Sequence, residues 1–449
     1  MSAKAVCGIA KISGKDMAGN YKVFGRVEGR LSVGDEINVT NFGCDDKTVV
    51  KSTIISMIDG GSDVFIAENC SLEITISNDD GCLDSEGSKL RVGSVIYNDD
   101  ASLEDIHKEY ITAINDGYFR YNTAFTIEDM EDFSIADCSQ ILSVLIYNIN
   151  KVFPKDDKLS EADKKAAIES SSKKRNALKV VLTHKIVSSK SIFVLYNTKT
   201  NHPHLFTGVF ETPDKGSMLV PPEFMVIPAA YVELFKMKNN IEDTEYREIK
   251  CPEGSNGIIS FLGDRFYIDG AAGIFVVSRN VELAAEKIVA KPEFLVTGSK
   301  VVSDEARKDI RAQVNPEAVC FMCILTQLGN PLTLKKDSDK LIYNNVSVFL
   351  ARALVGSKVL VKVKKDENSS AFLLPTVDGK NGKKAVIAYT DITHMPKEEG
   401  AQITVLSEEL ENILSQYDCL IDRNAESPSL GIYLSMDTYK KMKKDLGRS

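Results

Sequence analysis

Short apolar runs separated by glycine-containing turns fill the first 97 positions of the chain. In the run that follows Gly34, Ile37 and Val39 alternate with polar residues, the spacing that turns one face of a β-strand to a core and the other to water. We expect Gly34 to have a positive φ, a conformation that a residue with a Cβ resists. The pattern predicts a small antiparallel barrel, whose closure would remove exposed sheet edges.

After the predicted barrel the spacing of apolar residues becomes helical. The positions that recur at helical intervals are Ile106, Tyr110, Ile111 and Ile114. Ser102 followed by Asp105 resembles a capping arrangement at the start of this helix. A mostly apolar run over 134–153 predicts a second, buried helix, and Ser160 is expected to start a third. The pattern favours a helical connector over 99–185.

Beyond this connector the pattern is that of mixed α/β structure, and a similar order of elements recurs. The two copies are predicted around 187–285 and 357–446, with 286–356 as a further partial copy or a connection. In the first copy a strand is expected to feed a helix over 223–236, and the segment 257–270 is expected to form a hairpin.

The bulk composition agrees with a folded protein of several domains. A chain of 449 residues exceeds one ordinary core, and 43% hydrophobic with 27% charged residues is typical of globular proteins. We therefore predict a multidomain α+β fold. Its parts are an antiparallel β-barrel (1–98), a helical connector (99–185), an α/β domain (186–285) and a second α/β domain with its preceding connection (286–449).

Charge and cysteine usage narrow the class of protein. The formal net charge of −9 disfavours a dedicated nucleic-acid binder, which usually carries a basic face. The nine cysteines are odd in number and scattered, which favours reduced thiols over a disulfide framework. The N-terminus has no apolar signal region, and no run approaches the roughly 18 apolar residues of a membrane span. We expect a cytoplasmic protein with no membrane partner.

Two groups of residues could carry metal or redox chemistry. Cys320 and Cys323 form a C-x-x-C, but they stand in a continuous apolar run that favours buried structural cysteines. His202 and His204 could share one face of a strand and bind a metal. No Asp, Glu or Cys is near them in sequence, so a hairpin loop with two surface histidines is the preferred interpretation. His394 is isolated in the sequence.

Three further segments imitate functional motifs. The basic run 173–179 could contact phosphate or RNA, but a solvated helix face opposite Ala166, Ile168, Ala177 and Val180 is preferred. Segment 377–385 has the composition of a phosphate loop without its spacing, and is better explained by hairpin turns. The acidic segment 127–137 lacks EF-hand spacing and favours a solvated helix start. The sequence therefore predicts no catalytic residues, no metal and no cofactor.

The barrel segment resembles a known family. Residues 23–39, V-F-G-R-V-E-G-R-L-S-V-G-D-E-I-N-V, resemble the second domain of translational GTPases of the elongation factor Tu type. Ala67–Asn69 is similar to that domain's A-G-E/D-N segment, and 91–96 is similar to its closing R-G-x-V-L. The resemblance implies a β-barrel and places Asn69 where the family's asparagine lies near the aminoacyl end of tRNA. A turn-capping role for Asn69 is the preferred alternative. The GTPase motifs G-x-x-x-x-G-K-[ST] and N-K-x-D are lacking, so no GTPase activity is expected.

The C-terminal copies resemble the N-terminal domain of the SseB family, a bacterial α/β module with no well-defined reaction. The similar segments are F-L-L-P-T-V-D-G at 372–379, A-Y-T-D at Ala388–Asp391, and 191–206 and 261–270 in the first copy. The resemblance implies an α/β fold and little chemistry.

Three functional hypotheses follow. The leading one is a non-enzymatic interaction or regulatory protein of the bacterial cytoplasm, with another protein as partner. The second is a translation-associated factor that binds tRNA or the ribosome through the barrel, which salt-sensitive RNA binding would distinguish. The third is an enzyme whose site is assembled from residues far apart in sequence, which a deep polar cleft would favour.

Overall fold

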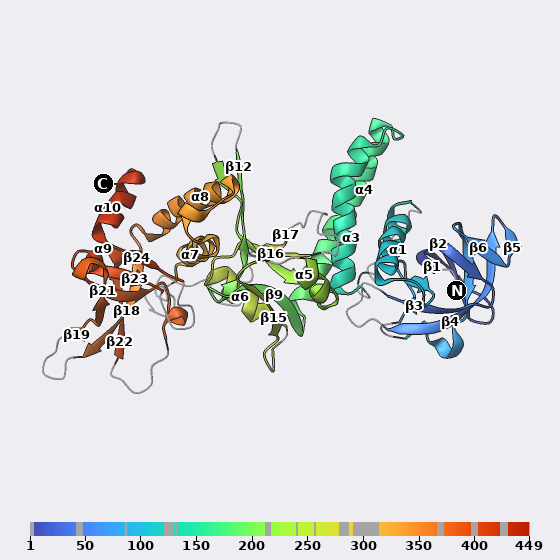
Figure 1. Ribbon diagram of the computed structural model, residues 1–449, viewed down its shortest axis with the longest axis horizontal. Coiled ribbons are helices and arrows are strands. Elements are labelled where there is room, and N and C mark those ends of the chain that lie inside the picture. Colours follow the sequence, from blue (N-terminus) through green and yellow to red (C-terminus); the bar gives the residue numbers. More distant parts are fainter. Residues whose placement is uncertain are drawn as a thin grey trace. The chain divides into compact units, whose positions relative to one another are not determined.

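The computed structural model describes most of the chain, and the description below concerns only those residues (Figure 1). They are 4–41, 48–85, 88–120, 130, 133–211, 217–238, 241–255, 257–277, 287–290, 314–365, 372–396, 403–422 and 430–448. The chain forms two compact units. The first comprises Met1–Ile186, Pro228–Lys238 and Val277–Glu286, and the second comprises Val187–Ile227, Asn239–Val276 and Lys287–Ser449. Within the described ranges, we find no helix with the length and apolar character needed to span a membrane.

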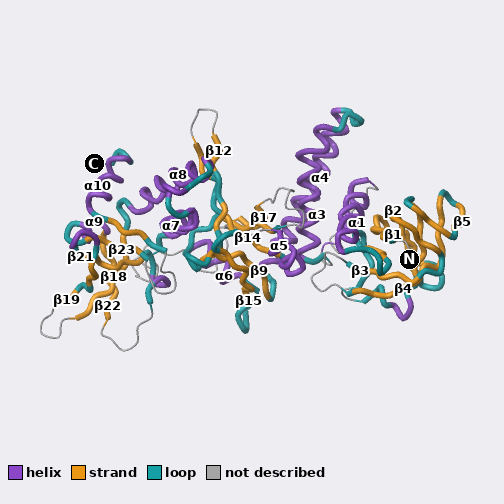
Figure 2. The backbone as a smooth tube through the Cα atoms, in the orientation of Figure 1, coloured by secondary structure: helices purple, strands orange, loops and turns teal. Residues whose placement is uncertain are grey.

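Six antiparallel strands close into a barrel at the start of the first unit, which confirms the predicted barrel (Figure 2). Around it run β1 (Ala5–Lys15), β8 (Val95–Tyr97), β3 (Glu36–Thr40), β4 (Val49–Asp59), β7 (Ser71–Ile76) and β2 (Tyr21–Ser32). The barrel closes because β2 also pairs with β1. The short strands β5 (Ser62–Val64) and β6 (Ile66–Glu68) pair with β4 and β2, and a 3₁₀ turn, η1 (Asp79–Gly81), follows β7.

The barrel core follows from the alternation of side chains. Along β2, Val23, Val27 and Leu31 are at most 1% exposed, whereas Arg26 and Arg30 between them face solvent. Gly34, in the turn before β3, has the predicted positive φ, at 90°. One face of each strand therefore fills the barrel, as the sequence pattern requires.

Helix α1 (Leu103–Asn115) lies directly against β1. Gly8 permits this approach, because a Cβ at that position would stand 2.3 Å from the carbonyl oxygen of Glu109. The predicted capping box is present: Ser102 Oγ accepts from the backbone N–H of Asp105 at 3.2 Å, and Asp105 accepts from the backbone N–H of Ser102 at 3.1 Å. The helix covers the outside of β1, so the first six residues of this strand are buried on both faces.

Two further helices complete the described part of the connector. The helix α3 (Ile135–Tyr147) is buried over most of its length, as predicted, and α4 (Glu161–Val187) follows. The predicted apolar face of α4 is wrong: Val180 is 71% exposed, because the buried positions lie on a different face of the helix. Those positions are Ser171, Leu178, Leu182 and Ile186. The intervening turns are η2 (Asp116–Arg120), η3 (Asn148–Val152) and η4 (Phe153–Lys155).

Two sheets in the second unit share one connectivity. The first has the order β10-β9-β14-β16-β17, with β11 on β14 and β15 on β9. The second has the order β19-β18-β21-β23-β24, with β20 on β21 and β22 on β18. In each sheet the pair β14–β16 or β21–β23 is parallel and the other pairs are antiparallel. The predicted duplication is thus present at the level of strand order.

The bounds of these strands place both copies in the sequence. The first sheet contains β9 (Ser191–Asn197), β10 (His202–Pro203), β11 (Leu205–Phe206), β14 (Glu223–Ile227), β15 (Thr244–Lys250), β16 (Gly273–Val276) and β17 (Lys287–Ala290). The second contains β18 (Lys358–Lys365), β19 (Phe372–Leu373), β20 (Thr376–Asp378), β21 (Lys384–Tyr389), β22 (Ile403–Glu409), β23 (Asp418–Ile421) and β24 (Ile432–Leu434). A separate two-stranded sheet, β12 (Val209–Glu211) with β13 (Ser217–Leu219), is inserted between β11 and β14.

Helices join and flank the two sheets. In the first copy β14 feeds η5 (Ala229–Tyr231) and α5 (Val232–Lys238), as predicted, and these two belong to the first unit. The described part of the connection between the copies contains α7 (Pro316–Leu328), η9 (Pro331–Thr333) and α8 (Asp337–Leu354). The second copy contains η10 (Lys380–Gly382), η11 (Ile392–His394), α9 (Leu410–Leu414) and α10 (Met436–Asp445).

The hairpin predicted over 257–270 is wrong, because this segment forms helix α6 (Ile259–Tyr267). Ile258, Leu262 and Phe266 are all 0% exposed and recur every fourth residue. That spacing buries one helical face, and it outweighs the strand preference of the aromatic residues in the segment.

A buried carboxyl group, that of Glu109, links α1 to the partly exposed Glu28 of the barrel. Burial raises the pKa of Glu109 to about 7, and its hydrogen bond to Glu28 on β2 adds to the shift. Glu28 also accepts from Lys108 Nζ at 2.9 Å, which holds the pKa of Glu28 below its ordinary value. The protonated Glu109 therefore donates to an ionised Glu28.

We predict that the free energy of unfolding falls as the pH rises from about 4.5 to about 7, since the folded state holds a proton on Glu109 that the unfolded state has released. Glu109→Gln keeps a neutral donor and should remove this pH dependence. Urea unfolding of the full chain at several pH values measures it. Glu104→Gln, at an exposed position on the same helix, is the control and should keep the wild-type slope. An unchanged slope in Glu109→Gln would contradict the assignment.

Candidate functional site

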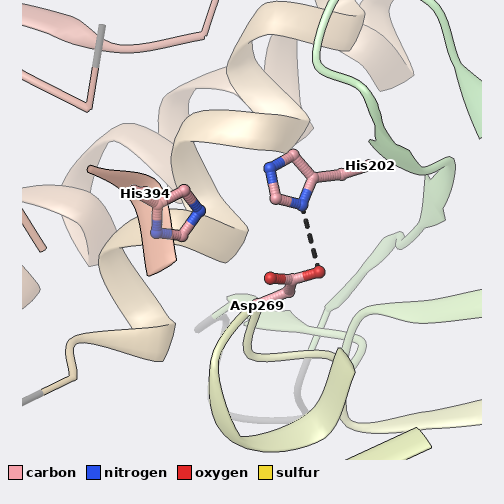
Figure 3. Close-up of side chains that lie close together, drawn as sticks. All are labelled: His202, Asp269 and His394. Atoms are coloured by element: carbon pink, nitrogen blue, oxygen red, sulfur yellow. Dashed lines mark hydrogen bonds and ion pairs between the residues drawn. The ribbon is translucent and has the colours of Figure 1, made fainter. Parts of the chain in front are cut away.

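Three side chains from distant segments meet in the interior of the second unit. They are His202, Asp269 and His394, which point toward one another in Figure 3. One possible ligand atom from each lies within 4.8 Å of the others. Their side chains are 10%, 5% and 7% exposed, and the two imidazole centroids are 5.5 Å apart. The cluster is buried and is made of groups that bind protons or metal ions.

His202 is placed by the tight turn between β9 and β10. Asn197, at the end of β9, accepts from the backbone N–H groups of Lys199 and Thr200, both at 3.1 Å. Asn201 then takes a φ of 56°, which reverses the chain and pairs His202 with Asn197. Asparagine is well suited to both roles, because its side chain bonds the backbone and it tolerates left-handed φ. The turn aims His202 Nδ1 at Asp269 Oδ2, 3.0 Å away.

Asp269 follows the last turn of α6. Gly270 after it has a φ of 75° and packs so closely that a Cβ would stand 2.1 Å from the carbonyl oxygen of Pro316. One helical turn earlier, Arg265 donates to Asp269 Oδ2 at 2.6 Å. Burial by itself would raise the pKa of Asp269, but the charges of His202 and Arg265 hold that pKa below its ordinary value. Asp269 is therefore a buried anion that accepts from two sides.

His394 lies in the turn η11 after β21. Asp391 begins this turn and accepts from the backbone N–H groups of Thr393 and His394, at 2.8 and 3.2 Å. The second oxygen of Asp391 lies 2.5 Å from His394 Nδ1. Burial alone would lower the pKa of His394, but the Asp391 hydrogen bond and the charges of Asp422, Asp391 and Asp269 raise that pKa to about 9.

A third carboxyl group closes the site from the neighbouring strand. Asp422 follows β23, which runs parallel to β21, and accepts from the backbone N–H and Oγ1 of Thr390 at 2.8 and 2.6 Å. Burial raises the pKa of Asp422. Thr390 and Asp422 thus stand at the carboxyl ends of two adjacent parallel strands, the edge where α/β sheets commonly bind ligands. The arrangement can share protons among carboxyl and imidazole groups, and its three central residues can hold a metal ion.

The prediction of two surface histidines in this hairpin is wrong for His202. His202 is 8% exposed rather than on the surface, because the hairpin turns it inward. His394 is isolated in sequence but not in space. His204 stands outside the cluster: burial lowers its pKa to about 4, and its Nδ1 has no hydrogen-bond partner among the residues described. The carboxylate and the second imidazole that are absent near His202 in sequence come from Asp269 and His394.

The cysteine pair lies inside helix α7. Cys320 and Cys323 are at most 2% exposed, and burial raises the pKa of both thiols. Cys320 packs beside Gly270, since a Cβ on that glycine would stand 2.9 Å from the Cβ of Cys320. Both cysteines therefore occupy core positions, as their apolar run predicts.

Asn69 forms hydrogen bonds within the barrel. Its φ is 50°, its Oδ1 accepts from the backbone N–H of Gly29 at 2.9 Å, and its own N–H donates to the carbonyl of Gly29 at 3.1 Å. The side chain therefore braces the turn after β6 against β2. This arrangement corresponds to the turn-capping alternative for Asn69, and the predicted RNA contact stays a prediction.

The structure describes the three remaining candidate segments in whole or in part. The basic run 173–179 lies on α4, where Lys174 donates to the carbonyl of Tyr118 at 3.2 Å. Segment 377–385 is a strand-turn-strand, in agreement with the turn interpretation. The acidic segment 127–137 is described only at Met130 and from 133 on, so its earlier acidic residues lie outside the described structure. Asp137 completes the capping box of α3 with Ser134 and accepts from Arg91 at 2.6 Å.

A hollow of about 300 Å³ lies where α9 packs on the second sheet. Aliphatic residues and amides make up most of its lining: Val361, Val363, Leu374, Leu406, Glu408, Asn412, Ile413, Gln416 and Tyr417. This lining suits an apolar side chain with a polar end rather than an ion.

Comparisons with known proteins find similarity among solved structures. No protein-family model matches this chain, and no curated protein matches it. Among solved structures, the chain is similar to translation elongation factor SelB from Methanococcus maripaludis in its apo form, with 16% identity and a TM-score of 0.18. The similarity covers 22% of this chain and 19% of that one, so the chain spans about a fifth of that factor's length.

We predict that Asn69→Ala lowers the free energy of unfolding by about 1–2 kcal/mol, because it removes the acceptor for Gly29 N–H and puts alanine at positive φ. Asn69→Gly also loses the hydrogen bond but adopts this φ freely, so its loss should be smaller. Denaturant unfolding of the full chain compares the two variants. Equal and negligible losses would show that Asn69 does not brace the barrel.

Proposed function

We propose that this chain is a non-enzymatic interaction or regulatory protein of the bacterial cytoplasm, and that its partner is another protein. The observation that carries the proposal is the β12–β13 hairpin of the second unit, which exposes apolar side chains. The buried position of the His202 cluster supports it as well, since groups sealed in a core do not meet a substrate.

The hairpin is a two-stranded sheet of its own and rises beside α8 in Figure 1. Phe210 and Met218 stand directly opposite each other on its two strands and are 47% and 53% exposed. Val220, just after the hairpin, is 38% exposed. Paired aromatic and thioether side chains in water are typical of protein contact surfaces, where such residues are enriched.

The hairpin is also an addition to the repeated fold. In the second copy, the equivalent link between β20 and β21 is the short turn η10. An isolated two-stranded hairpin is marginally stable in water, so this one needs support. The end of β13 next to the turn is held on α8, where Ser217 Oγ donates to Asn345 Oδ1 at 2.9 Å. An inserted, anchored hairpin with an apolar pair is suited to binding rather than to supporting the core.

The proposal also assigns the barrel and the α/β copies to known types of domain. We assign the barrel to the elongation factor Tu domain-2 type, which is supported by the V-G-D-E turn between β2 and β3 and by Asn69 beside Gly29. We assign the α/β copies to SseB-like modules, which is supported by their shared strand order and by the A-Y-T-D segment at the end of β21.

A translation-associated role through the barrel is the alternative. The net charge of −9 and the use of the Asn69 side chain within the barrel weigh against it. Fluorescence anisotropy of the full chain with labelled tRNA, over a series of salt concentrations, separates the two proposals. Binding that weakens steeply with salt would favour the alternative.

We predict that the double change Phe210→Ser with Met218→Ser abolishes partner binding, because it removes the exposed apolar pair. Affinity purification of the tagged full chain from its native cell, followed by mass spectrometry, identifies the protein retained by the wild type. Direct binding of the purified partner is then measured for each variant. Leu332→Ser, at a position 92% exposed in η9, is the control and should bind as the wild type does. Equal binding by the double variant would reject the hairpin as the contact surface.

A further inference from the structure

We propose that His202, Asp269 and His394 bind one divalent transition-metal ion, zinc above all, with one donor atom from each residue, and that Asp391 orients His394 toward it. This site does not depend on the proposed function, because it is buried in the second unit and none of its residues belongs to the β12–β13 hairpin.

The separations of the donor atoms fit a single ion. Zinc binds imidazole nitrogen and carboxylate oxygen at about 2.0–2.2 Å, so two ligands of one ion stand at most about 4 Å apart. The three donors already lie within 4.8 Å of one another, and His202 Nδ1 is 3.0 Å from Asp269 Oδ2. Side-chain rotations that move each donor by less than about an ångström would complete the coordination. In Figure 3 the three side chains surround a common point.

The surroundings resemble the outer shell of metal sites. Asp391 holds Nδ1 of His394, which fixes the ring so that the metal would be bound through Nε2, and such carboxylate–histidine pairs orient metal ligands. Arg265 donates to Asp269 Oδ2, so the carboxylate of Asp269 is also held in place. Two of the three donors, those of Asp269 and His394, thus come from side chains whose positions are set by a second contact.

Several carboxyl groups lie around the site. The carboxyl groups of Asp269, Asp391 and Asp422 gather there, and Arg265 pairs with Asp269. Buried carboxylates are costly unless they are paired or bound to metal. A divalent ion bound between the two imidazoles and Asp269 would replace the direct hydrogen bond between His202 and Asp269 as a partner of that carboxylate.

The donor set indicates the kind of metal. Two imidazoles and one carboxylate suit zinc and ferrous iron, and do not suit calcium or magnesium, which prefer oxygen ligands. Within the described structure, the cysteines of α7 are not part of the donor group. The ion would join residues of both α/β copies, since His202 and Asp269 belong to the first and His394 to the second.

The test uses the full chain, stripped with a chelator and then titrated with zinc in competition with a fluorescent chelator. The wild type should bind one zinc ion, and its melting temperature should rise on binding. His202→Ala and His394→Ala should abolish this binding. Asp391→Asn should weaken it by about 10- to 100-fold without removing a ligand. His204→Ala, two residues from His202 on the same hairpin, is the matched control and should bind as the wild type does.

Cobalt in place of zinc provides a second readout that does not need the variants to fold. Bound cobalt should show the absorption of a nitrogen and oxygen ligand set. An intense thiolate-to-metal band would assign the ion to cysteines and overturn the proposal. Failure of the wild type to bind zinc, or equal binding by His202→Ala and the His204→Ala control, would overturn it too. Loss of zinc binding with intact hairpin-mediated partner binding would leave the proposed function standing.

Discussion

Burying the carboxylate of Asp269 determines how the second unit is assembled around it. Taking an ion out of water costs several kcal/mol, a cost that is offset only where charged or hydrogen-bonding groups meet it. Arg265, one turn earlier, forms an ion pair with this carboxylate, and His202, on a hairpin of the first sheet, forms a hydrogen bond with it. His394 lies on its remaining side, from the second sheet. The hairpin turn and the end of α6 must therefore both be formed for the carboxylate to be satisfied.

Much of the fold could be predicted from local sequence. The barrel strands follow from alternation and from Gly34, and the starts of α1 and α3 follow from Ser102 and Ser134 with an aspartate three residues later. Helix α6 was missed because its aromatic residues resemble a strand, while its buried spacing at Ile258, Leu262 and Phe266 becomes apparent only against a partner surface. Local propensity is a weak guide where packing decides.

The site could not be predicted in the same way, since its three residues come from separate segments. The histidine pair at 202 and 204 drew attention to the correct hairpin, but only one of the two enters the cluster. The partners come from the end of a helix that was expected to be a hairpin and from a turn beyond a strand of the other copy. A-Y-T-D at Ala388–Asp391 served only to suggest a family, although Asp391 is the residue that holds His394. The three residues come together only when both sheets have formed.

The division of the chain into units has a consequence for biosynthesis. The first unit includes Pro228–Lys238 and Val277–Glu286, which the ribosome makes long after the barrel. Within that unit, Ser139 Oγ donates to the carbonyl of Val277 at 2.7 Å, and Tyr231 donates to the carbonyl of Ala136 at 3.4 Å. Part of the apolar surface of helix α3 therefore stays uncovered while the strands of the second unit are being synthesised. Domains normally fold as they leave the ribosome, but this nascent chain finishes its first unit only after much of the first α/β copy has been translated.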